Sequence, residues 1–132
     1  MERSVTSWTV AAALFLAAAV MLGAFGAHAL RGRLDAYAAG IWEKAVFYHF
    51  VHALGLLVVS LLPRVGALNA EWSGWVCALL AAGVVLFSGS LYLLAVTGVR
   101  MLGAVTPVGG VAFIAGWLLL AWKLAMSMRA QM

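Results

Sequence analysis

Residues 72–99 have the sequence WSGWVCALLAAGVVLFSGSLYLLAVTGV, a stretch of 28 residues without one charged side chain. An α-helix rises about 1.5 Å per residue, so about 20 apolar residues cross the hydrocarbon core of a bilayer. No water reaches the backbone in that core, and the peptide groups must therefore be hydrogen-bonded within the segment itself. The stretch predicts a transmembrane helix.

Three further stretches share this character. Uncharged runs of 27, 19 and 22 residues cover residues 4–30, 45–63 and 101–122. None of them alternates polar with apolar residues, as the strands of a transmembrane barrel do. We predict an all-α integral membrane four-helix bundle that forms a single transmembrane domain over residues 1–132, with both termini on one side. The expected spans are about residues 8–30, 45–62, 72–97 and 107–126.

The composition excludes several other classes of protein. Hydrophobic residues make up 67% of the chain and charged residues 9%, whereas soluble domains are about half apolar and a quarter charged. The same values exclude a disordered chain. The net charge is +4, but the basic residues are single and scattered, which argues against a nucleic-acid partner. The lone cysteine, Cys77, excludes an internal disulfide and a CxxC motif.

Signals at the helix ends leave some alternatives open. The pattern at residues 27–29, Ala-His-Ala, resembles a signal-peptide cleavage site, but the run before it exceeds the roughly 7–15 residues of a signal-peptide core, so we expect a retained helix. Pro63 is expected to close the second helix. Thr106 and Pro107 fit an N-cap followed by proline, which predicts a fourth helix starting at Pro107. The alternative is a helix that begins near Met101 and is kinked at Pro107.

The segment between the first two spans has its own periodicity. Apolar residues fall at helical spacing from Leu34 to Trp42, which places them on one face of a helix. We predict a short interfacial helix at about residues 34–42 that lies on the membrane and is anchored by Trp42. The alternative is an irregular loop with some helical turn.

The distribution of basic residues does not predict the orientation in the membrane. Four basic residues fall on the side of the termini and four on the side of the long loop. The positive-inside rule requires a bias toward one side. The sequence therefore leaves the orientation undetermined.

Polar residues gather in the half of the predicted bundle away from the termini. His52 lies roughly 12 Å along a helix from Lys44, and Tyr92 roughly 12 Å from Arg100, so both lie well below the headgroups. Polar groups at that depth are costly unless they are paired. We predict a one-sided polar pocket, ligand-binding or structural, that opens toward the side of the long loop. Its residues are His28, Tyr48, His52, Ser88 and Tyr92, and its rim is Arg31, Glu43, Lys44 and Arg100.

The predicted pocket has three interpretations. Its residues form a hydrogen-bonded clasp between helices, or they bind a small molecule, a lipid headgroup or a partner, or His28 and His52 ligate a haem or a metal. The chain has no HxxxH motif and no inward carboxylate, so we expect no cofactor and no metal. His49 is turned about 100° from Tyr48 and is expected near the interface, so His52→Leu is predicted to be more damaging than His49→Leu.

Nothing in the sequence indicates an enzyme. The segment Ser88-Gly89-Ser90 is too short a pattern to mark a nucleophile. No acidic residue lies within a span, where it could orient a histidine. The same absence argues against a proton-coupled exporter, which uses a buried carboxylate.

Four short motifs stand in order along the chain. They are residues 23–28 (GAFGAH), Tyr48 with His52, residues 86–92 (LFSGSLY), and residues 106–110 (TPVGG) followed by Gly116-Trp117. This combination resembles the YgdD-like small membrane proteins, domain-of-unknown-function family 423, whose animal relatives are known as transmembrane protein 256. The resemblance covers nearly the whole chain and implies a bacterial cytoplasmic-membrane protein with four spans. It implies no activity, and His49 lies outside the family pattern.

Together these observations predict an accessory, non-enzymatic multi-pass protein of the cytoplasmic (inner) membrane. It is expected to bind a lipid or small ligand, or to pack on a larger membrane complex. The expected partners are membrane lipids, with a homo-oligomer or a larger membrane complex as further partners, and no nucleic acid. The alternatives are a small homo-oligomeric transporter or channel, which needs a continuous water path, and a haem or metal-binding membrane protein.

Overall fold

The computed structural model describes residues 2–132 and is helical throughout that range, apart from short connections. Its elements in order are α1 (Glu2–His28), α2 (Ala36–Leu61), η1 (Leu62–Val65), α3 (Ala70–Gly83), η2 (Val84–Ser88), α4 (Gly89–Thr97), η3 (Arg100–Ala104) and α5 (Thr106–Ala130). Four continuous helical stretches are long and apolar enough to cross a membrane, namely Arg3–His28, Ala36–Val65, Ala70–Thr97 and Arg100–Ala130. The predicted all-α fold with four spans is confirmed. The first residue of the predicted domain lies outside the described part.

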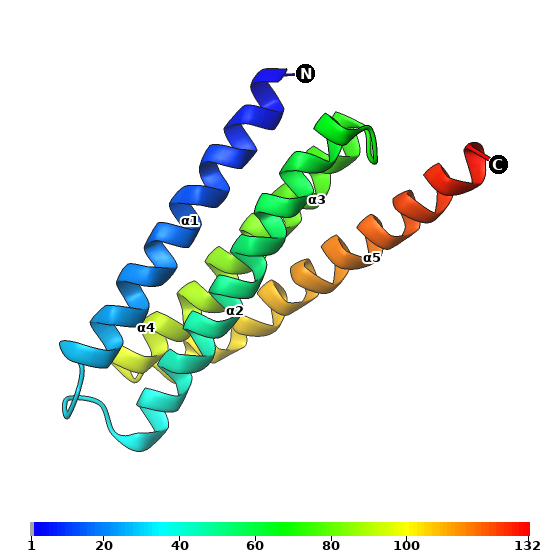
Figure 1. The fold of residues 1–132 in the computed structure, drawn as a ribbon. Helices are drawn as coiled ribbons and strands as arrows, with labels where there is room; N and C mark the ends of the chain where they lie inside the picture. The colour runs from blue at the N-terminus through cyan, green and yellow to red at the C-terminus, as the bar shows by residue number, and fades with distance from the viewer. Residues whose placement is uncertain (1) are drawn as a thin grey trace.

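The helix α2 lies at the centre of the arrangement. It packs against α1, α3, η2 and α4, whereas α5 packs mainly against α3 and η2. The central pair consists of α2 and the third span, which is formed by α3, η2 and α4. Figure 1 shows α1 and α5 on opposite sides of this pair, with the N- and C-termini at the same end of the molecule. The far end holds the end of α1, the start of α2 and the α4–η3 connection, and we call it the loop end.

The separate interfacial helix predicted over residues 34–42 is wrong. The helix α2 begins at Ala36, where the Asp35 carboxylate caps it by accepting a hydrogen bond of 2.8 Å from the Ala38 backbone nitrogen. It then continues without a break past Gly40 to Leu61. A glycine in a helix interior costs only about 1 kcal/mol relative to alanine, which is too little to end a helix that tertiary packing supports.

The ends of the other helices agree closely with the proline signals. The helix α2 ends at Leu61, and Pro63 lies in the 3₁₀ turn that follows it. The helix α5 starts at Thr106, one residue before the predicted position, and a separate 3₁₀ turn precedes it. Thr106 does not cap the helix with its side chain, contrary to prediction. Its hydroxyl instead lies 2.7 Å from the Ser90 hydroxyl and joins α5 to α4.

A row of hydrogen bonds joins the third span to α2. Three side chains on α3 and η2 donate to backbone carbonyls of α2 that are already part of its helical ladder. These bonds are Ser73 to Val59 (2.9 Å), Cys77 to Leu56 (3.9 Å) and Ser88 to Ala45 (2.8 Å). The order of donors runs opposite to the order of acceptors, so the bonds fix the antiparallel register of the two helices.

The π-helical turn η2 allows two backbones to meet. Residues Val84–Ser88 widen the third span locally, and the Gly89 N–H donates to the Val84 carbonyl. A Cβ atom on Gly109 would overlap with the backbone of Phe87 in this turn. The helices α5 and η2 are therefore in direct backbone contact. Lipid offers no hydrophobic drive for helix association, so membrane helices depend on close packing of this kind at small residues.

The buried core lies between α2, the third span and α5, and Ala12 of α1 also belongs to it. It includes Leu56 and Val59 from α2, Val76 and Leu80 from α3, and Phe113 from α5. Many large apolar side chains on the outer faces are exposed, among them Leu14 on α1 and Ile114 on α5. An apolar exterior of this kind is suited to acyl chains rather than to water.

The contact between Gly109 and Phe87 generates a prediction. Alanine at position 109 would force α5 away from η2, whereas the nearest atoms to a Cβ at position 110 lie 3.8 Å away, on the Phe87 ring. Gly109→Ala should lower the free energy of unfolding by about 1–3 kcal/mol, the usual cost of overpacking. Gly110→Ala, the matched control, should be neutral or stabilising because alanine favours a helix.

Denaturation in a mixed-detergent titration would measure both variants. Equal stabilities for the two alanine variants would contradict the direct contact between α5 and η2.

Candidate functional site

His28 does not join the other residues of the predicted polar pocket. It is the last residue of α1, and its side chain is exposed. The face of α1 that meets α2 carries Gly23 and Gly26, whose missing side chains give room to Val46 and Trp42. Successive residues are about 100° apart around a helix, so His28 points about 200° away from Gly26. The position of His28 along the helix predicts its depth in the membrane, but the direction of its side chain depends on the rotation of α1 about its own axis.

His52 is buried in a cluster of aromatic rings. It is 6% exposed, and its ring stacks on Phe113 with centroids 3.5 Å apart. Its Nδ1 atom lies 2.8 Å from the backbone carbonyl of Tyr48 and donates to it. The Tyr48 ring in turn packs against Phe87 at 4.5 Å. His52 and Tyr48 thus share one face of α2, as predicted, but that face is filled by aromatic side chains from η2 and α5.

His49 is buried and not at the interface, so that expectation is wrong. It is 4% exposed, and its Nδ1 atom lies 3.0 Å from the Tyr92 hydroxyl. The Phe15 ring of α1 contacts it edge-on. Because α2 is the central helix, the side that carries His49, about 60° around the helix from His52, is covered as well, by α1 and α4. The reason for expecting His52→Leu to be more damaging than His49→Leu therefore disappears.

The second ring nitrogen of His49 has no partner. Its Nε2 atom is buried toward the backbone of Phe15, yet no described atom lies in hydrogen-bonding geometry to it. The hydrogen bond between Nδ1 and the Tyr92 hydroxyl runs in either direction, according to which ring nitrogen of the neutral histidine carries the proton.

Ser88 acts as a clasp between helices. Its side chain is fully buried and donates to the Ala45 carbonyl. The contacts of Ser88, His52 and Tyr92 are thus contacts with the protein itself. Within residues 2–132, no group of three or more His, Cys, Asp or Glu side chains is placed to hold a metal ion. The two histidines on which the haem alternative depended are not brought together.

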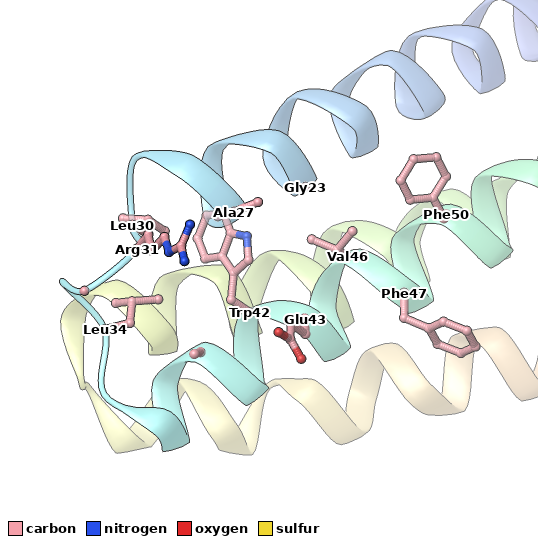
Figure 2. A pocket seen from close by; sticks show the side chains of 13 residues that line it. Gly23, Ala27, Leu30, Arg31, Leu34, Trp42, Glu43, Val46, Phe47 and Phe50 are labelled. Carbon is pink, nitrogen blue, oxygen red and sulfur yellow. The ribbon is translucent and has the colours of Figure 1, made fainter.

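A pocket of about 640 Å³ lies at the loop end, between α1 and the first turns of α2 (Figure 2). It contains none of the five predicted pocket residues, but two residues of the predicted rim, Arg31 and Glu43, line it. Its other lining residues are Gly23, Gly26, Ala27, Leu30, Gly32, Leu34, Ala39, Trp42, Val46, Phe47 and Phe50. The sequence signal that could have found it is the pair of glycines on α1, which a search for polar residues overlooks.

Trp42 forms the wall of the pocket and is held from several sides. Its indole nitrogen donates to the Leu22 carbonyl at 3.0 Å. Its ring occupies the space beside Gly26, where a Cβ would overlap with it. The rings of Phe25 and Tyr92 lie 6.0 Å and 4.7 Å away. The wall is therefore rigid and its hydrogen-bonding capacity is already used, so the polar groups left for a ligand are at the mouth.

The mouth of the pocket carries charges of both signs. Arg31 follows the end of α1, and Glu43 lies on α2; both are exposed. In the view of Figure 2 they flank the Trp42 side chain. No ion pair joins them within the described part of the chain, and neither has a hydrogen-bonded partner there. The other predicted rim residues, Lys44 and Arg100, are exposed at the same end but do not line the pocket.

The fold and this pocket define a small helical membrane protein with four spans and a cavity at one membrane face. Comparison with known families narrows the class. Residues 22–110 match the family described as "Protein of unknown function (DUF423)", and the chain belongs to that family. The resemblance seen in the sequence motifs is thereby confirmed.

Related proteins support the same assignment. A UPF0382 membrane protein of Staphylococcus epidermidis is 56% identical over 102 residues, which cover 77% of this chain and 81% of the relative. The UPF0382 membrane protein YwdK of Bacillus subtilis is 50% identical over 104 residues, or 77% of this chain and 82% of the relative. No solved structure matches the chain.

The pair formed by His49 and Tyr92 generates the second prediction. Tyr92→Phe removes the partner of Nδ1 and leaves both ring nitrogens of a buried histidine unpaired. Hydrogen bonds between membrane helices contribute about 0.5–2 kcal/mol, so the variant should lose that much stability. Tyr48→Phe is the matched control, since the Tyr48 hydroxyl forms no hydrogen bond within residues 2–132.

Unfolding in detergent, followed by circular dichroism, would compare the two variants. If both phenylalanine variants were as stable as the wild type, the hydrogen bond to His49 would contribute nothing.

Proposed function

We propose that this protein is a non-enzymatic accessory protein of the bacterial cytoplasmic membrane that holds a lipid in the pocket between α1 and α2. The observation that carries the proposal is the arrangement of the pocket. The half-buried apolar residues Val46 and Phe50 line it, together with the exposed charged side chains of Arg31 and Glu43. An amphiphile has matching parts, because its hydrocarbon chain suits the apolar residues and its polar headgroup suits the charged ones.

The position of the pocket supports a ligand that comes from the bilayer. Arg31 lies just beyond the end of a transmembrane helix, the level at which basic side chains reach the headgroups. The volume of about 640 Å³ falls in the range of pockets that hold small ligands. Relatives that are named membrane proteins come from bacteria, which supports the proposed location.

The chemistry of the lining supports binding rather than catalysis. The lining residues include a guanidinium and a carboxylate, but no serine, cysteine, histidine or lysine. A nucleophile with a neighbouring base is therefore not assembled there. The histidines of the protein lie elsewhere, in contact with aromatic rings.

The packing below the pocket argues against the alternative of a channel through one chain. Leu56, Val59, Val76 and Leu80 are fully buried and fill the interior between α2 and α3. The hydroxyls in the half near the termini, such as Ser60 and Ser73, donate to backbone carbonyls of α2. This closed apolar half supports an accessory role, either alone with membrane lipids, as a homo-oligomer or on a larger membrane complex.

The proposal predicts that filling the pocket expels its lipid. Ala27 is exposed and lines the pocket, so Ala27→Trp should occupy part of the cavity with little effect on the helix contacts. Native mass spectrometry from gentle detergent should show a lipid-bound wild type and a largely lipid-free variant. It would report the number of subunits and any partner in the same spectrum.

The matched control is Ala17→Trp, which adds the same side chain at an exposed position of α1 away from the pocket. It should retain the lipid. If Ala27→Trp retained as much lipid as Ala17→Trp, the pocket would not be the binding site and the proposal would fail.

A further inference from the structure

Two side chains of opposite charge line the pocket at the loop end. Arg31 and Glu43 both line the pocket, carry opposite charge and are not joined by an ion pair within residues 2–132. Resting on the proposed function, we infer that the ligand is a zwitterionic phospholipid with a primary ammonium group, of the phosphatidylethanolamine type. Its phosphate would bind Arg31, and its ammonium group would bind Glu43.

Arg31 is suited to the phosphate. A guanidinium presents several N–H donors in a plane and binds phosphate oxygens through paired, charge-assisted hydrogen bonds. The residue that follows, Gly32, has a φ of 75°, in the left-handed region that favours glycine. This conformation belongs to the turn after α1, in which the Arg33 N–H donates to the Leu30 carbonyl at 3.0 Å. Arg31 lies in this turn and lines the cavity (Figure 2).

Glu43 selects the second part of the headgroup. A carboxylate accepts hydrogen bonds from an ammonium N–H, and a primary ammonium has three of them. A choline headgroup carries positive charge but no N–H, so it gains less from this contact. An anionic headgroup such as phosphatidylglycerol brings no cation and would place its phosphate near an uncompensated carboxylate. The two side chains therefore match a headgroup that is itself a dipole.

The interior accommodates the chain that follows the headgroup. Val46 and Phe50 succeed Glu43 on α2 in steps of three and four residues, so they continue along one side of the helix toward the membrane interior. A cavity of about 640 Å³ suits the headgroup and the upper part of one acyl chain. The remaining hydrocarbon would stay in the bilayer.

The test is lipid competition in the full-length protein. Wild-type protein would be equilibrated with equal amounts of phosphatidylethanolamine, phosphatidylglycerol and phosphatidylcholine of identical acyl chains, and the bound lipid would be read by native mass spectrometry. We expect about tenfold preference for phosphatidylethanolamine, the ratio that one charge-assisted hydrogen bond can supply.

Two variants divide the recognition between its parts. Glu43→Gln should reduce the preference for phosphatidylethanolamine over phosphatidylglycerol to about twofold or less, while total lipid stays bound. Arg31→Gln should weaken retention of all three phospholipids. Lys44→Gln and Arg33→Gln are the matched controls, because these charges are exposed at the same end but do not line the pocket. Both should behave as the wild type does.

The outcomes separate this inference from the proposed function. Equal binding of phosphatidylglycerol and phosphatidylethanolamine by the wild type, or an unchanged preference in Glu43→Gln, would overturn the headgroup assignment. The pocket would still be a lipid site if Ala27→Trp expelled that lipid. Retention of lipid by Ala27→Trp would instead overturn the proposed function and this inference with it.

Discussion

The structure depends on the requirement that polar groups inside a bilayer be paired within the protein. The third span meets this requirement by donating from Ser73, Cys77 and Ser88 to carbonyls of α2. These bonds fix the register of the central helix pair, and α1 and α5 are added on either side of it. The polar residues of the spans are thus mainly the means by which the helices recognise one another. The pocket lies where this pairing ends, at the loop end.

Glycine determines how closely the helices approach and where a cavity remains. Gly109 lets the backbone of α5 touch η2, and Gly26 makes room for the Trp42 ring against α1. Where a large side chain fills the space beside a glycine, the contact is closed. At the loop end, Ala27 of α1 and Gly32 in the turn after α1 line the pocket, and no atom lies within 4 Å of a Cβ placed on Gly32. The same small residues that allow tight packing therefore also create the cavity.

The candidate site was only partly predictable from the sequence. Two charged residues of the predicted rim, Arg31 and Glu43, line the pocket, because their depth follows directly from their position at the helix ends. The polar interior was not where depth alone placed it. His28 is turned outward and His49 inward, because the direction of a side chain depends on which neighbours surround its helix. A sequence gives the relative rotation of residues on one helix but not the absolute rotation of that helix in the bundle.

The sequence by itself determined the class of protein and its four spans. A stretch of about 20 uncharged residues fits the interior of a bilayer, and there a helix hydrogen-bonds all of its backbone groups within the segment. It also located the helix ends near Pro63 and Pro107, because proline acts on the backbone locally. Only the tertiary structure decided that residues 36–42 extend α2, that α2 is covered on both faces, and that a cavity opens beside Trp42. These features arise from contacts between helices distant in sequence, and a cavity in particular is the space that no side chain occupies, which no local pattern encodes.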